Sequence, residues 1–247
     1  MKIAVAQPTY LPWLGYFDLM DQVDTFVLLD SVQFEKQSWQ QRNRIKTPSG
    51  VQWLTVPVKI TGRSTQLIRD VEIAEADFHL RHLNLIRDNY RIAPFYEMFF
   101  EPLAAILKEG ARQGSLGAMN IELIKWIATS LGIGTPLVRS STLPVEGKRA
   151  ALNLAICKAL GANAYYSAIG SADYLLEESG IFSDCGIEIY FQNYIHPRYQ
   201  QLFPPFSEFA SVIDLLFNAG PEAAAIMCRG RGTPLLPSQI ALQSSSA

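Results

Sequence analysis

Cysteine and histidine are scarce in this chain, and their scarcity excludes several kinds of site. The three cysteines, Cys157, Cys185 and Cys228, lack the CxxC spacing of a zinc site and form no disulfide framework. Two of the three histidines, His79 and His82, lie three residues apart on a polar helix face that we expect to be exposed, without a third ligand. The sequence therefore predicts no metal site and a reducing, cytoplasmic location.

An excess of charge of one sign is also missing. The 21 lysines and arginines nearly balance the 23 aspartates and glutamates, for a net charge of -2, so the chain lacks the basic footprint of a nucleic-acid-binding protein. Apolar runs stay shorter than a membrane span of about 20 residues, and Gln7, Pro8 and Pro12 interrupt any signal peptide. We expect a small-molecule substrate, no nucleic acid and no membrane insertion, while the oligomeric state stays open.

The common nucleophile and phosphate-binding motifs are absent as well. The chain contains no GxSxG, no GxGxxG and no evident Cys–His pair. The turn at Gly147-Lys148 lacks the spaced first glycine, and the Ser or Thr after lysine, of a P-loop. The cofactor is therefore undetermined, with ATP or another nucleotide as the candidates.

The first fifty residues carry the clearest positive pattern. Residues 2–6 and 25–29 have the composition of short buried strands, and residues 14–23 between them have helical spacing. Ligands of open α/β sheets bind outside the carboxyl ends of strands. We therefore expect residues 7–15 and 30–36 to face a ligand; the alternative is an unusually aromatic turn that packs on its own helix.

Later segments predict the rest of an α/β fold. Strands at 136–140, 164–167 and 187–191 alternate with helices at 148–160 and 172–179. This alternation is typical of right-handed crossovers between parallel strands. The fold class we predict is α/β, with a mostly parallel, Rossmann-like sheet.

Two additions interrupt the predicted sheet. A turn sequence at 47–50 joins two β-rich segments into a β-hairpin, and three helical patterns fill an insertion at about 76–132. We expect a single domain over residues 1–230. The remainder, residues 231–247, is rich in Gly, Pro and Ser and is predicted to be a disordered tail.

Candidate ligand-binding residues concentrate in the opening turn. Gln7 offers an amide that donates and accepts, and Tyr10 and Trp13 each offer a stacking face with a polar tip. Gly15 would let an anion approach the backbone donors at the helix start. The alternative for Trp13 is a place in the core. The other candidates are polar groups in loops that follow strands, where a solvated hairpin or a helix cap is the alternative: Lys36, Arg42, Asn43, Ser171 and Tyr174.

Two residues are candidates for catalysis. His196 lies in a loop after a predicted parallel strand, and Pro197 restricts its backbone, so it is placed to act as a general acid or base near neutral pH. The alternative is a structural loop histidine. Asp30 ends a predicted strand and is the rival base, provided that burial raises its pKa.

Several motifs together resemble the WbqC-like family over residues 2 to about 225. They are QPTYLPWLGYF (7–17), DSVQF (30–34), RNRIK (42–46), WLTVPV (53–58), LGA (160–162), GSADYL (170–175), HPRYQ (196–200) and DLLFNAGP (214–221). Members of this family are found among bacterial surface-polysaccharide (O-antigen) gene sets, and their biochemical activity is largely unassigned.

The resemblance implies a cytoplasmic transferase or ATP-dependent ligase that moves an amino-acid or acyl group to an amino sugar of a nucleotide-linked sugar. The alternative is a non-catalytic nucleotide-sugar or partner-binding protein of the same pathway. The opening also resembles HIGH-type nucleotidyltransferases and ligases in its strand, proline-aromatic turn, glycine and helix. Trp13 to Tyr16 stand where that motif has its two histidines, so adenylyl transfer by the usual route is not expected.

Overall fold

The fold is built on a five-stranded parallel sheet with the strand order β5-β2-β1-β6-β7. The computed structural model describes residues 1–244. From the central strand β1 the chain first adds β2 and β5 on one side, and then crosses over to add β6 and β7 on the other. The predicted Rossmann-like sheet is confirmed. Its strands are β1 (Lys2–Ala6), β2 (Thr25–Leu28), β5 (Leu137–Arg139), β6 (Ala164–Ser167) and β7 (Glu188–Phe191).

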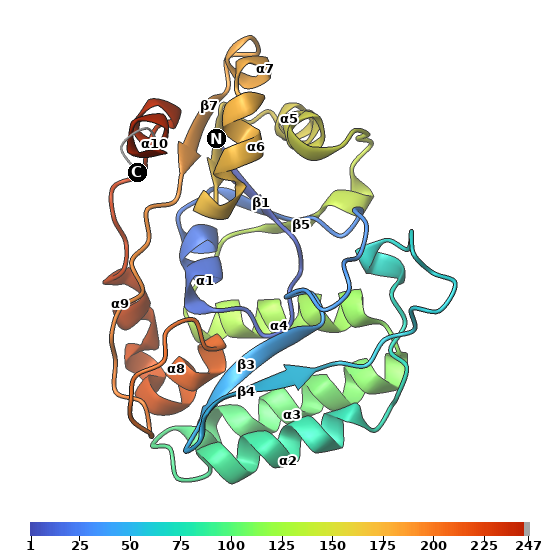
Figure 1. The fold of residues 1–247 in the computed structure, drawn as a ribbon, viewed down its shortest axis with the longest axis vertical. Helices are drawn as coiled ribbons and strands as arrows, with labels where there is room; N and C mark the ends of the chain where they lie inside the picture. The colour runs from blue at the N-terminus through green and yellow to red at the C-terminus, as the bar shows by residue number, and fades with distance from the viewer. Residues whose placement is uncertain (245–247) are drawn as a thin grey trace.

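Both faces of this sheet are buried under helices, as the continuous apolar composition of its strands requires. Successive side chains point to opposite faces: Ala4, Phe26 and Leu28 join one hydrophobic cluster, and Ile3 and Val27 join the other. The first cluster includes residues of α1 and α4, and the second includes residues of α5, α6 and α7 (Figure 1). These helices are α1 (Leu14–Asp21), α4 (Leu116–Ser130), α5 (Arg149–Leu160), α6 (Ala172–Glu177) and α7 (Gly180–Ser183).

The hairpin and the inserted helices form the lower part of Figure 1. The antiparallel strands of the hairpin stand apart from the main sheet, and β3 contacts α2 and α8. The elements are β3 (Arg42–Thr47), β4 (Gly50–Thr55), α2 (Phe78–Tyr90) and α3 (Tyr96–Gln113). Four short 3-10 helices lie at Ile68–Asp70, Ser140–Thr142, Ile169–Ser171 and Gly220–Glu222.

The C-terminal segment is more ordered than its composition indicates. Arg231 pairs with Asp18 and Asp21 of α1, and the backbone of Leu235 bonds that of Phe191 in β7. Burial of these contacts outweighs the effect of the glycines and prolines nearby, so the disorder expected from residue 231 does not begin there. The helices of this part are α8 (Val212–Ala219), α9 (Ala223–Cys228) and α10 (Pro237–Ser244). The last three residues, 245–247, lie outside the described part of the chain.

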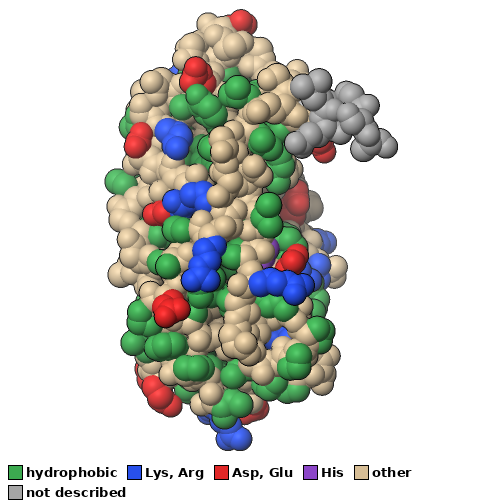
Figure 2. Space-filling model, turned by 90° about the vertical axis from the view of Figure 1, so that its left-hand side faces the viewer, with side chains coloured by type: hydrophobic (Ala, Val, Ile, Leu, Met, Phe, Trp, Pro, Cys, Tyr) green, Lys and Arg blue, Asp and Glu red, His purple; other side chains and the backbone are tan. Residues whose placement is uncertain are grey.

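Basic, acidic and apolar side chains are interspersed on the face over α8, α9 and β7 (Figure 2). Within residues 1–244, no helix combines the length and the apolar character needed to cross a bilayer. In the same part of the chain, no three or more His, Cys, Asp or Glu side chains come close enough together to hold a metal ion.

His82 is buried, although we expected it on an exposed helix face. Its Nδ1 accepts a hydrogen bond from the Tyr10 hydroxyl at 2.8 Å, and its Nε2 lies 3.2 Å from the backbone oxygen of Thr55. With its proton on Nε2, the neutral ring donates to Thr55 and accepts from Tyr10, so both nitrogens have partners inside the protein. Burial lowers the pKa of His82 to about 4.

We expect His82 to make the protein less stable in mild acid. Between its unfolded pKa of about 6.5 and its folded pKa of about 4, only the unfolded chain binds the proton. The free energy of unfolding therefore falls as pH drops through this window, by about 1.4 kcal/mol per pH unit for one proton. Urea unfolding of His82→Gln across this range should show a slope smaller by one proton. His79→Gln, on the same helix, should keep the wild-type slope; equal slopes in all three proteins would contradict the prediction.

Candidate functional site

A cavity of about 650 Å³ opens at the carboxyl ends of β1 and β2, the edge at which open α/β sheets bind ligands. Gln7 directly follows β1, Leu29 and Ser31 follow β2, and the turn before α5 forms another side. We call this the polar cavity. It is lined by Gln7, Leu29, Ser31, Val32, Gln33, Glu35, Thr65, Leu67, Gly147, Lys148, Arg149, Leu152, Asn153 and Tyr174.

Lys148 and Arg149 give one side of the polar cavity a positive charge. They follow Gly147, whose φ of +132° favours glycine and whose Cβ, if present, would lie 3.0 Å from the backbone nitrogen of Leu152. This close approach sets the turn at the start of α5. Within the described residues, neither cation has an acidic partner, so both are free to bind an anion.

Other polar groups complete the polar cavity. The Asn153 amide nitrogen donates to the Tyr165 hydroxyl at 3.0 Å and lies 3.4 Å from the Tyr174 hydroxyl. Among the described residues that line this cavity, Glu35 alone carries a carboxylate, and it is exposed. The cavity therefore combines two cations with one potential proton acceptor.

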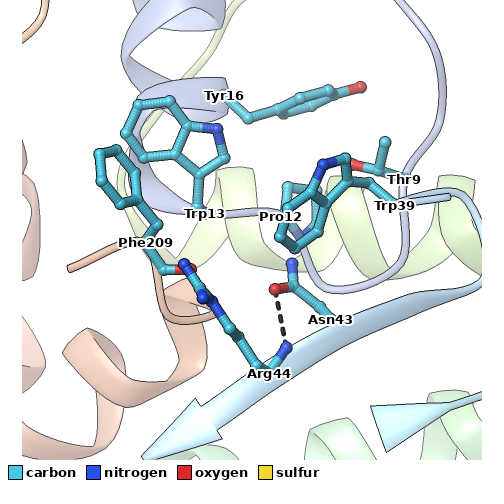
Figure 3. A pocket seen from close by; sticks show the side chains of 8 residues that line it. All are labelled: Thr9, Pro12, Trp13, Tyr16, Trp39, Asn43, Arg44 and Phe209. Atoms are coloured by element: carbon cyan, nitrogen blue, oxygen red, sulfur yellow. Dashed lines mark hydrogen bonds between the residues drawn. The ribbon is translucent and has the colours of Figure 1, made fainter. Parts of the chain in front are cut away.

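A second cavity, of about 430 Å³, lies between the opening turn and β3. Figure 3 shows Trp13 and Phe209 on one side of it, Trp39 and Pro12 on the other, and Arg44 at its base. We call this the aromatic cavity. It is lined by Thr9, Pro12, Trp13, Tyr16, Trp39, Asn43, Arg44 and Phe209.

Gln7 links the polar cavity to a residue that lines the aromatic cavity. Its side-chain oxygen accepts a hydrogen bond from the Gln40 amide at 2.8 Å, and its backbone oxygen accepts one from the Tyr16 hydroxyl at 3.2 Å. Tyr16 lines the aromatic cavity, whereas Gln7 lines the polar one. Residues 7–15 and 30–36, which the sequence analysis placed at a ligand, are therefore distributed over two cavities that share no lining residue.

Tyr10 and Gly15 serve the packing of the opening turn and line neither cavity. Tyr10 is fully buried and bonds His82. An added Cβ at Gly15 would overlap the Trp13 ring, so the glycine makes room for that ring rather than for a ligand. Trp13 is thus the stacking candidate of this turn that reaches a cavity.

Asp30 is a buried carboxylate whose oxygens are taken by protein groups. Arg139 approaches Oδ2 at 2.7 Å, the Ser141 backbone nitrogen donates to Oδ1 at 2.9 Å, and the Ser140 and Ser141 hydroxyls also donate. Burial alone would raise the pKa of Asp30, but the Ser141 and Arg139 hydrogen bonds and the Arg139 charge outweigh burial and hold that pKa below its usual value. This is the reverse of the shift that a general base requires.

His196 lies behind the aromatic cavity, in contact with residues that line it. Its ring stacks on Trp13 at a centroid distance of 6.1 Å and meets Phe209 edge to face at 5.4 Å. Nδ1 is 3.0 Å from the Pro197 oxygen, and the buried Nε2 has no partner among the described residues. Burial lowers the pKa of His196, so the ring is neutral at pH 7.

The remaining predicted residues divide between the cavities and the surface. Asn43 and Tyr174 line the aromatic and the polar cavity, respectively. Arg42 instead packs over the Trp53 ring at 4.5 Å, Lys36 borders a smaller cavity that shares Gln33 and Glu35 with the polar cavity, and Ser171 lines neither of the two main cavities.

The sequence analysis missed several residues that line the two cavities. Trp39 lies shortly after residues 30–36, Arg44 lies in the RNRIK motif (42–46), and Lys148 and Arg149 follow a turn after a strand, so position alone could have indicated them. Phe209 gave no local signal, because it reaches the aromatic cavity only through long-range packing against Trp13.

Comparison with known proteins agrees with the resemblance seen in the sequence. The WbqC-like protein family matches residues 7–226. The chain belongs to the WbqC-like family. An uncharacterised protein of Mycobacterium tuberculosis, Rv1507c, is 35% identical over 223 residues, which cover 90% of this chain and 95% of the relative. No solved structure matches the chain.

The part of this WbqC-like protein that matches its family includes every residue that lines the two cavities. The match begins after β1 and ends before Arg231. The family relationship therefore covers the site, whereas the similar mycobacterial protein is uncharacterised.

Proposed function

We propose that this WbqC-like protein is a cytoplasmic transferase or ligase of surface-polysaccharide biosynthesis. It transfers an amino-acid or acyl group to the amino group of an amino sugar that is linked to a nucleotide. The observation that carries the proposal is the polar cavity at the switch point of the sheet, with Lys148 and Arg149 unpaired at the start of α5.

The polar cavity is suited to the diphosphate of a nucleotide sugar. Lys148 and Arg149 supply positive charge, and the first backbone N–H groups of α5 supply donors at the positive end of the helix dipole. A nucleotide cofactor such as ATP would use the same groups. Phosphate binding here would depend on the turn at Gly147 rather than on a P-loop.

Glu35 is the group that would accept a proton from the attacking amine, because its carboxylate borders the polar cavity. In this proposal His196 supports the ring of Trp13 from behind. Asp30 fixes the ends of β2 and β5 through Arg139 and Ser141.

A second candidate is a non-catalytic nucleotide-sugar-binding protein. Two observations favour it. Protein groups donate to both oxygens of the Asp30 carboxylate, and the Trp13 and Phe209 rings contact the His196 ring. Either function requires the nucleotide to bind in the polar cavity.

Substituting Lys148 with alanine is expected to weaken binding of uridine diphosphate and of a uridine diphosphate-linked amino sugar by about tenfold, since a hydrogen bond to a charged group contributes about 1.5–3 kcal/mol. Thermal shift and titration calorimetry would measure the loss. A wild-type protein at 100 times the dissociation constant should gain about 2.7 kcal/mol of stability.

Lys158→Ala is the matched control, because Lys158 lies in the last turn of the same helix α5, away from the polar cavity. Equal affinity in the Lys148 and Lys158 variants would reject the polar cavity as the nucleotide site. Mass spectrometry of the sugar after incubation with candidate donors separates the two functions, since binding without a mass increase supports the second candidate.

A further inference from the structure

The aromatic cavity contains one cation that no acidic side chain neutralises. Arg44 lies half-buried at the base of the cavity, where its Nε donates to the backbone oxygen of Phe209 at 3.3 Å. Its guanidinium carbon is 5.9 Å from the centroid of the Trp39 ring. Within the described residues, no Asp or Glu pairs with Arg44.

Two neighbouring polar side chains, Asn43 and Tyr16, already bond other protein groups. The Asn43 amide donates to the backbone oxygens of Leu11 at 2.7 Å and Tyr10 at 3.2 Å, and its oxygen accepts from the Arg44 backbone nitrogen. The Tyr16 hydroxyl bonds Gln7. Charge recognition in this cavity therefore depends on the Arg44 guanidinium, whose planar fork matches a carboxylate.

The aromatic side chains that line the cavity indicate the shape of the part of the ligand that does not contact Arg44. Trp13 and Phe209 face Trp39 and Pro12 across the cavity (Figure 3), an arrangement that accepts a flat apolar body between them. The described lining contains no carboxylate to receive an ammonium group. A ligand with one negative charge matches the one guanidinium, whereas a diphosphate matches the cations of the polar cavity.

We propose that the aromatic cavity binds a monocarboxylic acid with a flat, apolar body. Its carboxylate pairs with Arg44, and its body lies between Trp13 and Trp39. The acid without an α-ammonium group binds better than the corresponding amino acid. The proposal goes beyond the proposed function, because binding of this acid needs no transfer and holds whether or not the protein is a transferase.

The test compares a carboxylic acid with its neutral amide. For the wild-type protein, 3-phenylpropionate should quench tryptophan fluorescence, and calorimetry should show it to bind at least about tenfold more tightly than 3-phenylpropanamide, because a charge-assisted bidentate pair is about twice as strong as a neutral one. Phenylalanine should bind more weakly than 3-phenylpropionate. In Arg44→Gln the ratio of the affinities for the acid and the amide should fall to near unity. Trp39→Ala should instead lower the affinities for both ligands by a similar factor.

Arg42→Gln is the matched control, since Arg42 lies two residues away on β3 and packs on Trp53 outside the cavity; it should keep the wild-type preference. Far-ultraviolet circular dichroism would verify that the variants are folded, and Arg44→Met, which also removes the charge, replaces Arg44→Gln if that variant does not fold. An unchanged acid preference in the Arg44 variants, or no binding of 3-phenylpropionate at millimolar concentrations, would overturn the proposal.

Uridine diphosphate distinguishes this proposal from the proposed function. Trp39→Ala should leave its affinity unchanged, and Lys148→Ala should leave that of 3-phenylpropionate unchanged. Loss of uridine diphosphate binding in Trp39→Ala would place the nucleotide in the aromatic cavity and overturn both assignments, whereas unchanged uridine diphosphate binding in Lys148→Ala would reject only the assignment of the polar cavity.

Discussion

Replacing Arg231 with alanine is expected to lower the free energy of unfolding by about 3 kcal/mol. Arg231 bonds the fully buried Asp18 carboxylate at 2.8 Å and Asp21 at 2.7 Å. Removing one partner of a buried ion pair typically costs about 3–5 kcal/mol, because the other charge is left uncompensated. We expect a loss at the low end of this range, because the Gln192 and Gln22 amides still donate hydrogen bonds to Asp18 at 2.7 Å.

Urea unfolding at neutral pH would measure this loss, and two further variants test its cause. Asp21→Asn should lower the free energy of unfolding by less than about 1 kcal/mol, because the Asp21 side chain is partly exposed and solvent screens its ion pair with Arg231. Adding Asp18→Asn to Arg231→Ala should recover part of the stability, since no buried charge then remains. If Arg231→Ala and Asp21→Asn cost the same, the buried pair with Asp18 is not the main contribution.

Asp30→Asn is expected to destabilise the protein by about 2–3 kcal/mol at neutral pH. The carboxylate accepts bonds from Arg139, Ser140 and Ser141, and bonds to a charged group contribute about 1.5–3 kcal/mol. An amide in its place has one accepting oxygen and brings an NH₂ group against these donors. We therefore expect structural damage, whereas a purely catalytic aspartate would lose activity and keep its stability.

The pH dependence of this loss follows from the lowered pKa of Asp30. The stabilisation by the carboxylate is fully present above its unfolded pKa of about 3.9 and is lost as pH falls through the lower folded pKa. The difference in the free energy of unfolding between wild type and Asp30→Asn, measured with urea, should thus become smaller below a pH of about 4. Asp70→Asn is the control, because Asp70 is exposed and lies 3.7 Å from its partner Arg69. A constant gap at every pH would contradict the assignment.

Much of the architecture was predictable because it depends on local patterns. Helical spacing located α2, α3 and α4, and the alternation of short apolar runs with helices gave the parallel sheet. The rule for strand ends brought Gln7 and Tyr174 to the polar cavity. These features need only the periodicity of one segment and the handedness of crossovers.

Other features depend on partners that are distant in the chain, and no local pattern reveals them. His82 has the spacing of a polar surface residue, yet Tyr10 and Thr55 enclose it. Asp30 has the sequence position of a ligand-binding residue, but in the folded protein Arg139 and Ser141 bond its carboxylate. Composition likewise predicted a tail from residue 231, but Arg231 pairs with Asp18 and Asp21 and the Leu235 backbone bonds that of Phe191, and no local pattern reveals these contacts.

For the proposed transferase, the separation of the two cavities has a consequence for the order in which substrates bind. The two cavities share no lining residue, so a molecule in one cavity does not occupy the volume of the other. Two substrates can then be present together, and neither needs to leave before the second arrives. A transferase built in this way passes through a ternary complex, and its two substrates show no mutual competition.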